Sequence, residues 1–233
     1  MLVGSFLVPF GSRGKEDGQF LNPRGVVIDQ QGNYFVTDQQ SNRIQIFNSN
    51  GRFLRKFEGK KNHGSLKGPC GIGLLSNGNI VVSENGGNRL QIFDSQGNFV
   101  RIVGAGEVLE PQHLFVDADD NILVADSGNH RIQVFNQNGD HIKTIGAGEL
   151  SYPNGVCMDG EGKIIASDCG SGQASSFFLI DCVLFQEGNE TKTKMLKKKR
   201  KKFKVLFFFP PFPKCPFPKM RSCCKPAPLG TCP

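Results

Sequence analysis

Asn42-Arg43-Ile44-Gln45-Ile46-Phe47 is the most informative stretch of this 233-residue chain, because two close copies of it follow. The copies are Asn88-Arg89-Leu90-Gln91-Ile92-Phe93 and His130-Arg131-Ile132-Gln133-Val134-Phe135, so the arginines are 46 and 42 residues apart. Two further markers recur in step, and these are Pro23, Pro69, Pro111 and Pro153, and the turn glycines Gly4, Gly51, Gly97 and Gly139. Three markers that share one period identify an internal repeat.

Each repeat predicts four short β-strands. In the first repeat they lie at residues 25–29, 34–38, 43–47 and 53–57, which are rich in Val, Ile and Phe and separated by Gly and Asn turns. Four antiparallel strands in ~40–45 residues form one propeller blade, and no segment has a helical period. We therefore expect an all-β fold, a partial propeller of about three full four-stranded blades plus part-blades.

The ends of the repeat region predict incomplete blades. Residues 4–171 carry the repeats, and Phe6–Phe10 reads as the last strand of a preceding blade. Pairing of Phe6–Phe10 with the fourth repeat would close a four-bladed ring, which is the alternative arrangement.

The repeat resembles the NHL repeat. Asn129-His130-Arg131 is close to the Asn-His-Leu motif that names the family, residues 20–26 fit Phe-x-x-Pro-x-Gly-Val, and residues 10–20 fit Phe-Gly-x-x-Gly-x-x-x-Gly-x-Phe. The pattern looks most like the NHL domains that close tripartite-motif (TRIM-NHL) proteins. The resemblance implies a propeller, typically six-bladed, that binds protein or RNA, with a RING ubiquitin ligase far N-terminal, beyond B-boxes and a coiled coil.

The chain departs from that family in three respects. It shows no RING, B-box or coiled-coil pattern, so we expect no ligase catalysis on it. About three and a half repeats are too few for six blades, so missing blades or the rest of a longer chain are expected partners. Gln112-His113 stands where the first repeat has Arg24-Gly25, so one turn has lost its glycine.

The repeat pattern stops shortly after Asp168. Its register places Gln173 where the next arginine belongs, and residues 172–233 are rich in Lys, Phe, Pro and Cys, with the runs 197–202 and 207–211. Such adjacent runs resemble translated noncoding DNA, so we expect a disordered tail or a gene-model artefact. A nuclear-localisation or nucleic-acid patch and a basic, apolar membrane anchor are the alternatives. No apolar run approaches the ~18 residues of a membrane span, and no membrane partner is expected.

The net charge of +7 is unevenly distributed along the chain. Residues 1–70 have 10 Lys/Arg and 5 Asp/Glu, whereas residues 71–171 have 5 and 13. A nucleic-acid interpretation therefore rests on the first 70 residues and not on the overall charge. Cysteines are scattered without a C-x-x-C pair, which favours a reducing, cytoplasmic location.

An acid and an arginine recur at one spacing in three repeats. A residue kept in every repeat serves the scaffold, so each acid is expected to pair with its arginine between blade strands. The pairs are Asp38 with Arg43, Glu84 with Arg89, and Asp126 with Arg131.

Binding residues are expected where equivalent positions differ between repeats. The residue after each marker proline is Arg24, Cys70, Gln112 or Asn154, and the loop at residues 60–67 is basic. A positive rim there could contact phosphates, whereas a merely solvated loop is the alternative. The candidate binding residues are Arg13, Lys15, Arg24, Lys60, Lys61, His63, Lys67, Gln112 and Asn154.

These features predict a non-catalytic binding module, the part of a TRIM-NHL-like ubiquitin ligase that recognises a protein substrate or an RNA. One alternative is an RNA-binding post-transcriptional repressor that acts through the basic loops. Another is a metal-dependent propeller lyase or hydrolase. No cofactor or metal is expected, since there is no H-E-x-x-H, nucleophile elbow or P-loop, and the histidines and turn aspartates are assigned to repeat positions and loops. These are His63, His113, His130, His141, Asp117, Asp119 and Asp120.

Overall fold

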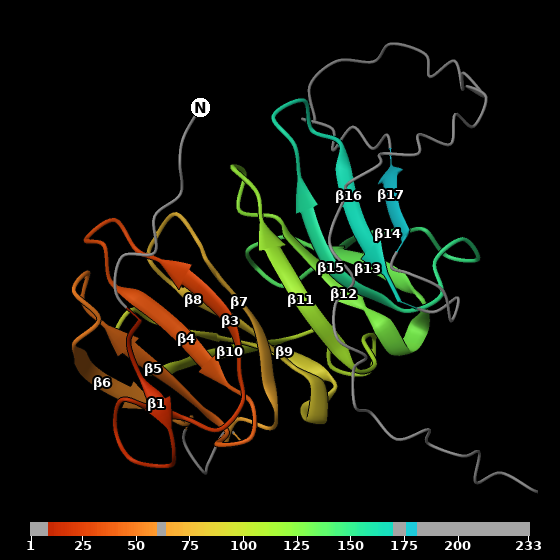
Figure 1. The fold of residues 1–233 in the computed structure, drawn as a ribbon. Helices are drawn as coiled ribbons and strands as arrows, with labels where there is room; N and C mark the ends of the chain where they lie inside the picture. The colour runs from red at the N-terminus through yellow and green to blue at the C-terminus, as the bar shows by residue number, and fades with distance from the viewer. Residues whose placement is uncertain (1–8, 60–63, 170–175, 181–233) are drawn as a thin grey trace, which may run out of the picture. The chain divides into compact units, whose positions relative to one another are not determined.

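The computed structural model describes residues 9–59, 64–169 and the backbone of strand 176–180. The chain divides into two units, Met1–Gln186 and Glu187–Pro233, and all described residues lie in the first. Within them the structure is almost wholly β (Figure 1), with only the three-residue 3₁₀ turns η2 (Asn85–Gly87) and η3 (Ser127–Asn129) of helical type. The expected all-β class is confirmed.

Three four-stranded antiparallel sheets follow one another along the chain, and a fourth has three described strands. The strands of the first sheet are β3 (Pro23–Ile28), β4 (Tyr34–Asp38), β5 (Arg43–Phe47) and β6 (Phe53–Phe57). The second has β7 (Pro69–Leu74), β8 (Ile80–Glu84), β9 (Arg89–Phe93) and β10 (Phe99–Val103). The third has β11 (Pro111–Val116), β12 (Ile122–Asp126), β13 (Arg131–Phe135) and β14 (His141–Ile145). The fourth has β15 (Pro153–Met158), β16 (Ile164–Asp168) and β17 (Ser176–Ile180), and the short β1 (Ser12–Arg13) and β2 (Gln19–Phe20) pair separately.

The predicted strands at 34–38, 43–47 and 53–57 have the bounds that the sequence indicated. The first strand begins at Pro23 and ends at Ile28 rather than spanning 25–29. Pro23 lies opposite Asp38, and a register shift follows before Val26. Proline is tolerated there because it is the first residue of its strand.

The fourth sheet extends beyond Ser171. β17 pairs with β16 in antiparallel register, from Asp168 opposite Ser176 to Ile164 opposite Ile180. The third strand of the fourth repeat therefore lies in the segment that the sequence interpretation assigned to the tail. The expected strand Phe6–Phe10 and its ring closure fall mostly outside the described residues, which begin at Pro9.

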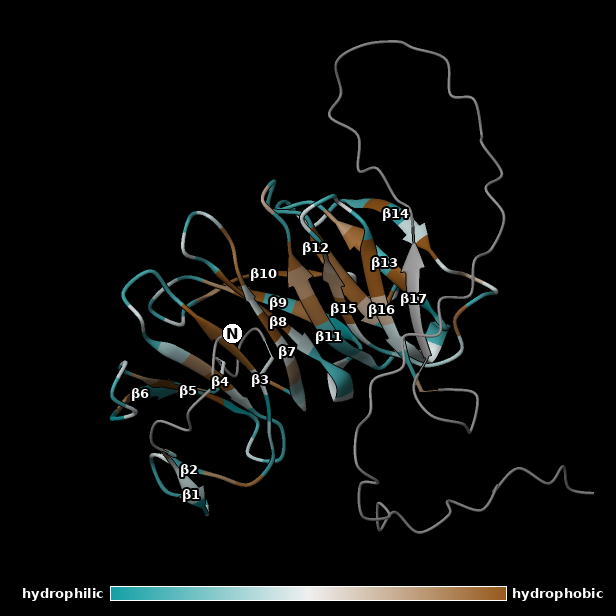
Figure 2. Cartoon of the chain, turned by 45° about the horizontal axis from the view of Figure 1, so that its top comes forward, coloured by the Kyte–Doolittle hydropathy of each residue, from teal (hydrophilic) through white to brown (hydrophobic). Residues whose placement is uncertain are grey.

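The core lies between neighbouring sheets, where apolar side chains of one sheet pack on those of the next. Figure 2 shows the hydrophobic residues concentrated in the strands and the hydrophilic ones in the connecting turns. One such cluster joins Ile44 and Phe35 to Ile72, Ile80 and Phe93, and two others join the second sheet to the third and the third to the fourth. Four-stranded sheets that pack face to face on their neighbours are typical of propeller blades.

Glycine permits the closest approach between sheets, at the first strands. A Cβ on Gly25 would lie 2.5 Å from the Cys70 carbonyl oxygen, and one on Gly71 would lie 2.6 Å from the Leu114 nitrogen. The strands β3, β7, β11 and β15 therefore come together, and the residues at their start are brought to one place. No helix in the described part of the chain is long and apolar enough to cross a membrane.

Candidate functional site

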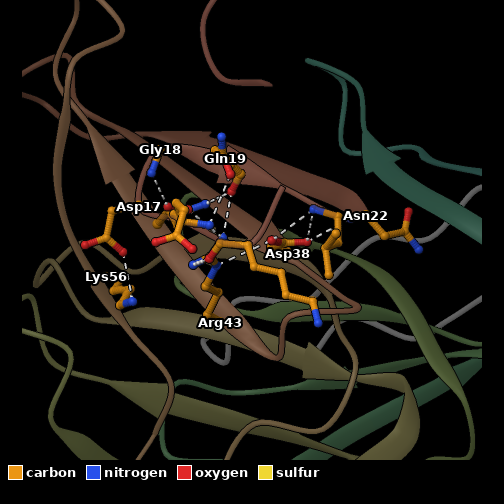
Figure 3. A network of polar contacts seen from close by, with 11 residues as sticks. Asp17, Gly18, Gln19, Asn22, Asp38, Arg43 and Lys56 are labelled. Atoms are coloured by element: carbon orange, nitrogen blue, oxygen red, sulfur yellow. Dashed lines mark hydrogen bonds and ion pairs between the residues drawn. The ribbon is translucent and has the colours of Figure 1, made fainter. Parts of the chain in front are cut away.

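In the first sheet, the end where β3 begins is held by a buried acid and arginine (Figure 3). In the first sheet Asp38 is fully buried and accepts the backbone N–H of Asn22 at 2.8 Å and of Leu21 at 3.2 Å. Arg43, which is 3% exposed, donates from Nε to Asp38 at 3.4 Å. Burial of this charge pair is made tolerable by the additional hydrogen bonds of both partners.

The outer guanidinium nitrogens of Arg43 bind the preceding loop. They donate to the carbonyl oxygens of Lys15 at 2.8 Å, Gln19 at 2.7 Å and Glu16 at 3.1 Å. Asp38 thus holds the end of the loop through N–H groups while Arg43 holds its middle through carbonyl groups. The pair fixes the loop that leads into β3, so its role is to shape this end of the sheet.

The other two acid–arginine pairs repeat the arrangement. Arg89 Nε lies 2.8 Å from Glu84, and Arg131 Nε lies 2.9 Å from Asp126. Arg131 also donates to the Glu107 carbonyl at 2.8 Å. Burial raises the pKa of Glu84 above its ordinary value, although hydrogen bonding and charge from Arg89 oppose that shift.

A pocket of about 280 Å³ opens at the same end, between the starts of the four first strands. Its lining includes every one of the four post-proline positions that vary between repeats. The pocket is slightly smaller than the ~300–1,000 Å³ of most small-molecule sites, so its size suits one side chain or one base of a larger partner. The lining residues are Pro23, Arg24, Cys70, Gly71, Gln112, His113 and Asn154.

Arg24 provides the positive charge of the pocket. Its side chain is exposed and donates to Gln112 Oε1 at 3.4 Å, which is a long hydrogen bond. Burial at the pocket wall lowers the pKa of His113, and the positive charge of Arg24 lowers it further. His113 is therefore a neutral imidazole at neutral pH.

Cys70 forms the floor of the pocket and is 3% exposed. Gln39 Nε2 donates to its sulfur at 3.0 Å. Burial raises the pKa of the Cys70 thiol, which outweighs the opposing effect of Arg24. A protonated, buried thiol is a poor nucleophile, so the pocket has polar groups for recognition and lacks an activated cysteine.

The structure brings together only some of the predicted binding residues. Arg24, Gln112 and Asn154 line the pocket. Lys15 and Lys67 are exposed and lie on loops at the same end. The carbonyl oxygen of Lys15 accepts from Arg43, and that of Lys67 accepts from the Gly86 N–H. Arg13 is exposed on β1. Lys60, Lys61 and His63 lie outside the described residues.

Sequence reasoning missed two pocket residues. Cys70 belongs to the post-proline series but is absent from the candidate binding residues. The sequence interpretation considers His113 as a replaced glycine and as one of four histidines not expected to bind metal, but not as a binding residue. That replacement puts an imidazole where Gly25 and Gly71 have no side chain. Within residues 9–59 and 64–169, no cluster of three or more His, Cys, Asp or Glu could hold a metal ion.

Comparison with known proteins identifies the repeat. The family model for the NHL repeat matches residues 20–47 and 110–135. Protein lin-41 of Caenorhabditis elegans is 40% identical over 50 residues, which is 22% of this chain and 4% of that protein. The E3 ubiquitin-protein ligase TRIM71 of Rattus norvegicus is 39% identical over 54 residues, 23% of this chain and 6% of that protein. Protein brain tumor of Drosophila melanogaster is 44% identical over 48 residues, 21% of this chain and 5% of that protein.

Solved structures are similar in fold. A nidogen/laminin complex has a TM-score of 0.56 at 19% identity, over 64% of this chain and 57% of that chain. A catalytically inactive virginiamycin B lyase from Staphylococcus aureus with quinupristin has a TM-score of 0.53 at 17% identity, over 73% and 58%. At these identities the likeness shows the propeller fold alone, and the matches with lin-41, TRIM71 and brain tumor cover only 4% to 6% of those proteins.

Proposed function

From the premise that this chain contains NHL repeats, we propose that it is a partner-recognition module of the kind that TRIM-NHL ubiquitin ligases carry. The pocket at the start of the first strands is its binding site, and the partner is a protein substrate. Catalysis of ubiquitin transfer would belong to other domains of the ligase that this module serves.

The composition of the pocket carries this proposal. Its lining gathers Arg24, Cys70, Gln112 and Asn154, one from each repeat, at the position where the repeats differ. A scaffold position would be kept, as Asp38 and Asp126 are, whereas variation at a surface opening is typical of a recognition site. One arginine surrounded by neutral amide and imidazole groups suits an anionic side chain, such as Asp or Glu, which a guanidinium can bind in bidentate fashion.

RNA binding is the second candidate, favoured by basic residues at the same end of the sheets. Arg13, Lys15, Arg24 and Lys67 are all exposed there. Phosphate contacts from such residues make affinity fall steeply with salt, by a slope of roughly one per contact. Combined Arg24→Glu, Lys60→Glu and Lys61→Glu substitution would then abolish a salt-sensitive gel shift, and an unchanged shift would reject this rim.

The test is a parallel selection with the full chain against a displayed random peptide library and a random RNA pool. The ligand recovered is then titrated by fluorescence anisotropy against wild type, Arg24→Glu and Arg52→Glu. Arg52 is exposed in the turn between β5 and β6, at the other end of the sheet, so it matches the charge change without touching the pocket.

We expect a peptide with an acidic anchor that binds Arg24→Glu at least roughly tenfold more weakly and Arg52→Glu as wild type. Equal affinity of the two variants would remove the pocket from the proposal. Recovery of RNA alone would replace the protein partner with the second candidate. We also propose a reducing, cytoplasmic setting, in keeping with the free thiols of Cys70, Cys157 and Cys169.

A further inference from the structure

The loops that lead into the third and fourth sheets carry only negative charge at the end of the sheets where the pocket opens. These loops, at residues 104–110 and 146–152, contain no Lys or Arg. They contain three glutamates, Glu107, Glu110 and Glu149, and each of these residues is exposed. We call these three residues the acidic rim.

The first two sheets present the opposite charge at the same end. Four exposed basic residues lie there, on the loops into β3 and β7 and on β3 itself. We call them the basic rim, and they are Arg13, Lys15, Arg24 and Lys67. The exposed acids Glu16 and Glu58 offset only part of this charge, since Asp17 is already paired with Lys56 at 2.8 Å. The end that bears the pocket is therefore positive over two sheets and negative over the other two.

The carboxylates of the acidic rim are not used to hold the loops. The backbone of Glu107 does so, because its carbonyl oxygen accepts from Arg131 at 2.8 Å. The N–H of Glu110 donates to Asn88 Oδ1 at 2.9 Å, and Glu149 occupies the place of Glu107 in the next loop. Within residues 9–59 and 64–169, none of the three carboxylates forms an ion pair. Their charge is therefore available to a partner.

An exposed aromatic pair lies in the acidic half. Tyr152 directly precedes the first strand of the fourth sheet and is 47% exposed. Its ring centre lies 4.8 Å from that of His130, in edge-to-face geometry. The tyrosine ring is thus packed on one side and accessible on the other, three residues after Glu149. An aromatic face near carboxylates suits a lysine or arginine side chain, which the ring attracts through its quadrupole.

The pocket lies between the two rims. Arg24 of the first sheet and Asn154 of the fourth both line it. A segment anchored in the pocket therefore has the basic rim on one side and the acidic rim on the other. Screening at physiological salt limits each exposed charge to groups within about 8 Å. The local arrangement of charge, and not the net charge of the chain, thus determines which flanking residues fit.

We propose that the partner segment has segregated charge, with an acidic run over the basic rim and a basic run over the acidic rim. This inference rests on the proposed recognition function, and it adds the chemistry of the residues that flank the anchor. The acidic anchor binds Arg24, further acids lie over Lys15 and Lys67, and lysines or arginines on the other side meet Glu110 and Tyr152. The acidic rim repels a uniform polyanion, so it selects against a partner that is negative along its whole length.

The test compares three synthetic peptides of equal length by fluorescence anisotropy with the full chain. The first has an acidic run followed by a basic run, the second alternates the same residues, and the third is acidic throughout. We expect the segregated peptide to bind more tightly than either of the others, by roughly threefold or more at low salt, because each exposed charge pair contributes little. This preference should vanish at about 1 M salt, where screening acts over roughly 3 Å.

Glu110→Lys and Lys67→Glu each reverse one charge of one rim. Both should weaken binding of the segregated peptide, again by roughly threefold or more. For the wholly acidic peptide they should act in opposite directions, since Glu110→Lys removes a repulsion and Lys67→Glu removes an attraction. Asp119→Lys and Arg52→Glu are the matched controls, because both residues are exposed in turns at the opposite end of the sheets. The controls should leave all three affinities unchanged.

Tyr152→Leu tests the aromatic contact separately. Leucine keeps an apolar side chain at this exposed position but lacks the quadrupole that attracts a cation. We expect the segregated peptide to bind roughly two- to fivefold more weakly and the wholly acidic peptide to bind as before. Equal loss of affinity for both peptides would contradict a cation contact at Tyr152.

Two further results would overturn the proposal. One is equal affinity for the segregated and alternating peptides, and the other is an effect of Glu110→Lys no larger than that of Asp119→Lys. If Arg24→Glu still weakens binding in either case, the pocket holds an acidic anchor but the rims do not select its flanks. Failure of the proposed function is a different result, in which Arg24→Glu leaves the affinity for every peptide unchanged, and the charge-segregated partner would fall with it.

Discussion

Two layers of residues at one end of the sheets differ in how much their residue types vary between the repeats. The acid–arginine layer is kept in kind from repeat to repeat, and Asp38, Glu84 and Asp126 are all fully buried. The pocket layer directly above takes a different residue from each repeat, and Arg24 and Asn154 there are exposed. The residues that recur in each repeat are thus the ones that hold the loops, and the residues that vary are the ones that the loops expose. The substitutions below should separate the two layers by their cost in stability.

Asp38→Ala should have the largest effect. It removes the acceptor of the Leu21 and Asn22 N–H groups and leaves Arg43 buried without its partner. Loss of one member of a buried pair costs about 3–5 kcal/mol of unfolding free energy, measured by urea denaturation.

Asp17→Ala is the matched control for Asp38→Ala. Asp17 forms an ion pair with Lys56 at 2.8 Å, but both side chains are largely solvated, at 52% and 38% exposed. Such surface pairs contribute about 0–1 kcal/mol. Equal losses for the two variants would mean that the buried layer is not what holds the loops.

Glu84 should produce a pH dependence of stability that its glutamine variant lacks. Burial raises the pKa of Glu84 above 4.5, so the folded state binds a proton more readily than the unfolded state does. The stability of wild type relative to Glu84→Gln should therefore be greatest below pH 4.5 and should fall as the pH rises through the folded pKa. Paired urea titrations from acid to neutral pH measure this difference. A relative stability that rises with pH would mean that Arg89 outweighs burial.

The acid–arginine layer was predictable from sequence because its residues recur at a fixed offset from strands with clear period-two patterns. The pocket was not, because it depends on how closely four first strands approach, and that approach is set by Gly25 and Gly71, which contact residues of the following repeat. The sequence named its post-proline residues as a variable series. It could not show that they surround one opening.

Two arginines between sheets were also missed. Arg55 donates to the Gln96 carbonyl at 3.0 Å, and Arg101 donates to the Asn138 carbonyl at 2.9 Å, so each ties a fourth strand to the outer turn of the next sheet. The signal was present, since both lie two residues before the end of a fourth strand. It could not be interpreted because, without the position of the neighbouring turn, arginines on a fourth strand are indistinguishable from solvated surface residues.

Arg24→Gln should have the smallest effect on stability and thereby sharpen the contrast between the layers. Arg24 is exposed and its described hydrogen bond to Gln112 is 3.4 Å long, so the unfolding free energy should change by less than about 0.5 kcal/mol.

The same Arg24→Gln variant should nevertheless change the electrostatics of the pocket. Arg24 lowers the pKa of His113, so removing the guanidinium should raise that pKa toward its ordinary value of 6.5 while burial still holds it below. An NMR titration of the His113 imidazole in wild type and Arg24→Gln measures the shift. A His113 pKa that does not move would mean that Arg24 points away from the pocket in solution, and the acidic anchor proposed for the partner would lose its recognition group.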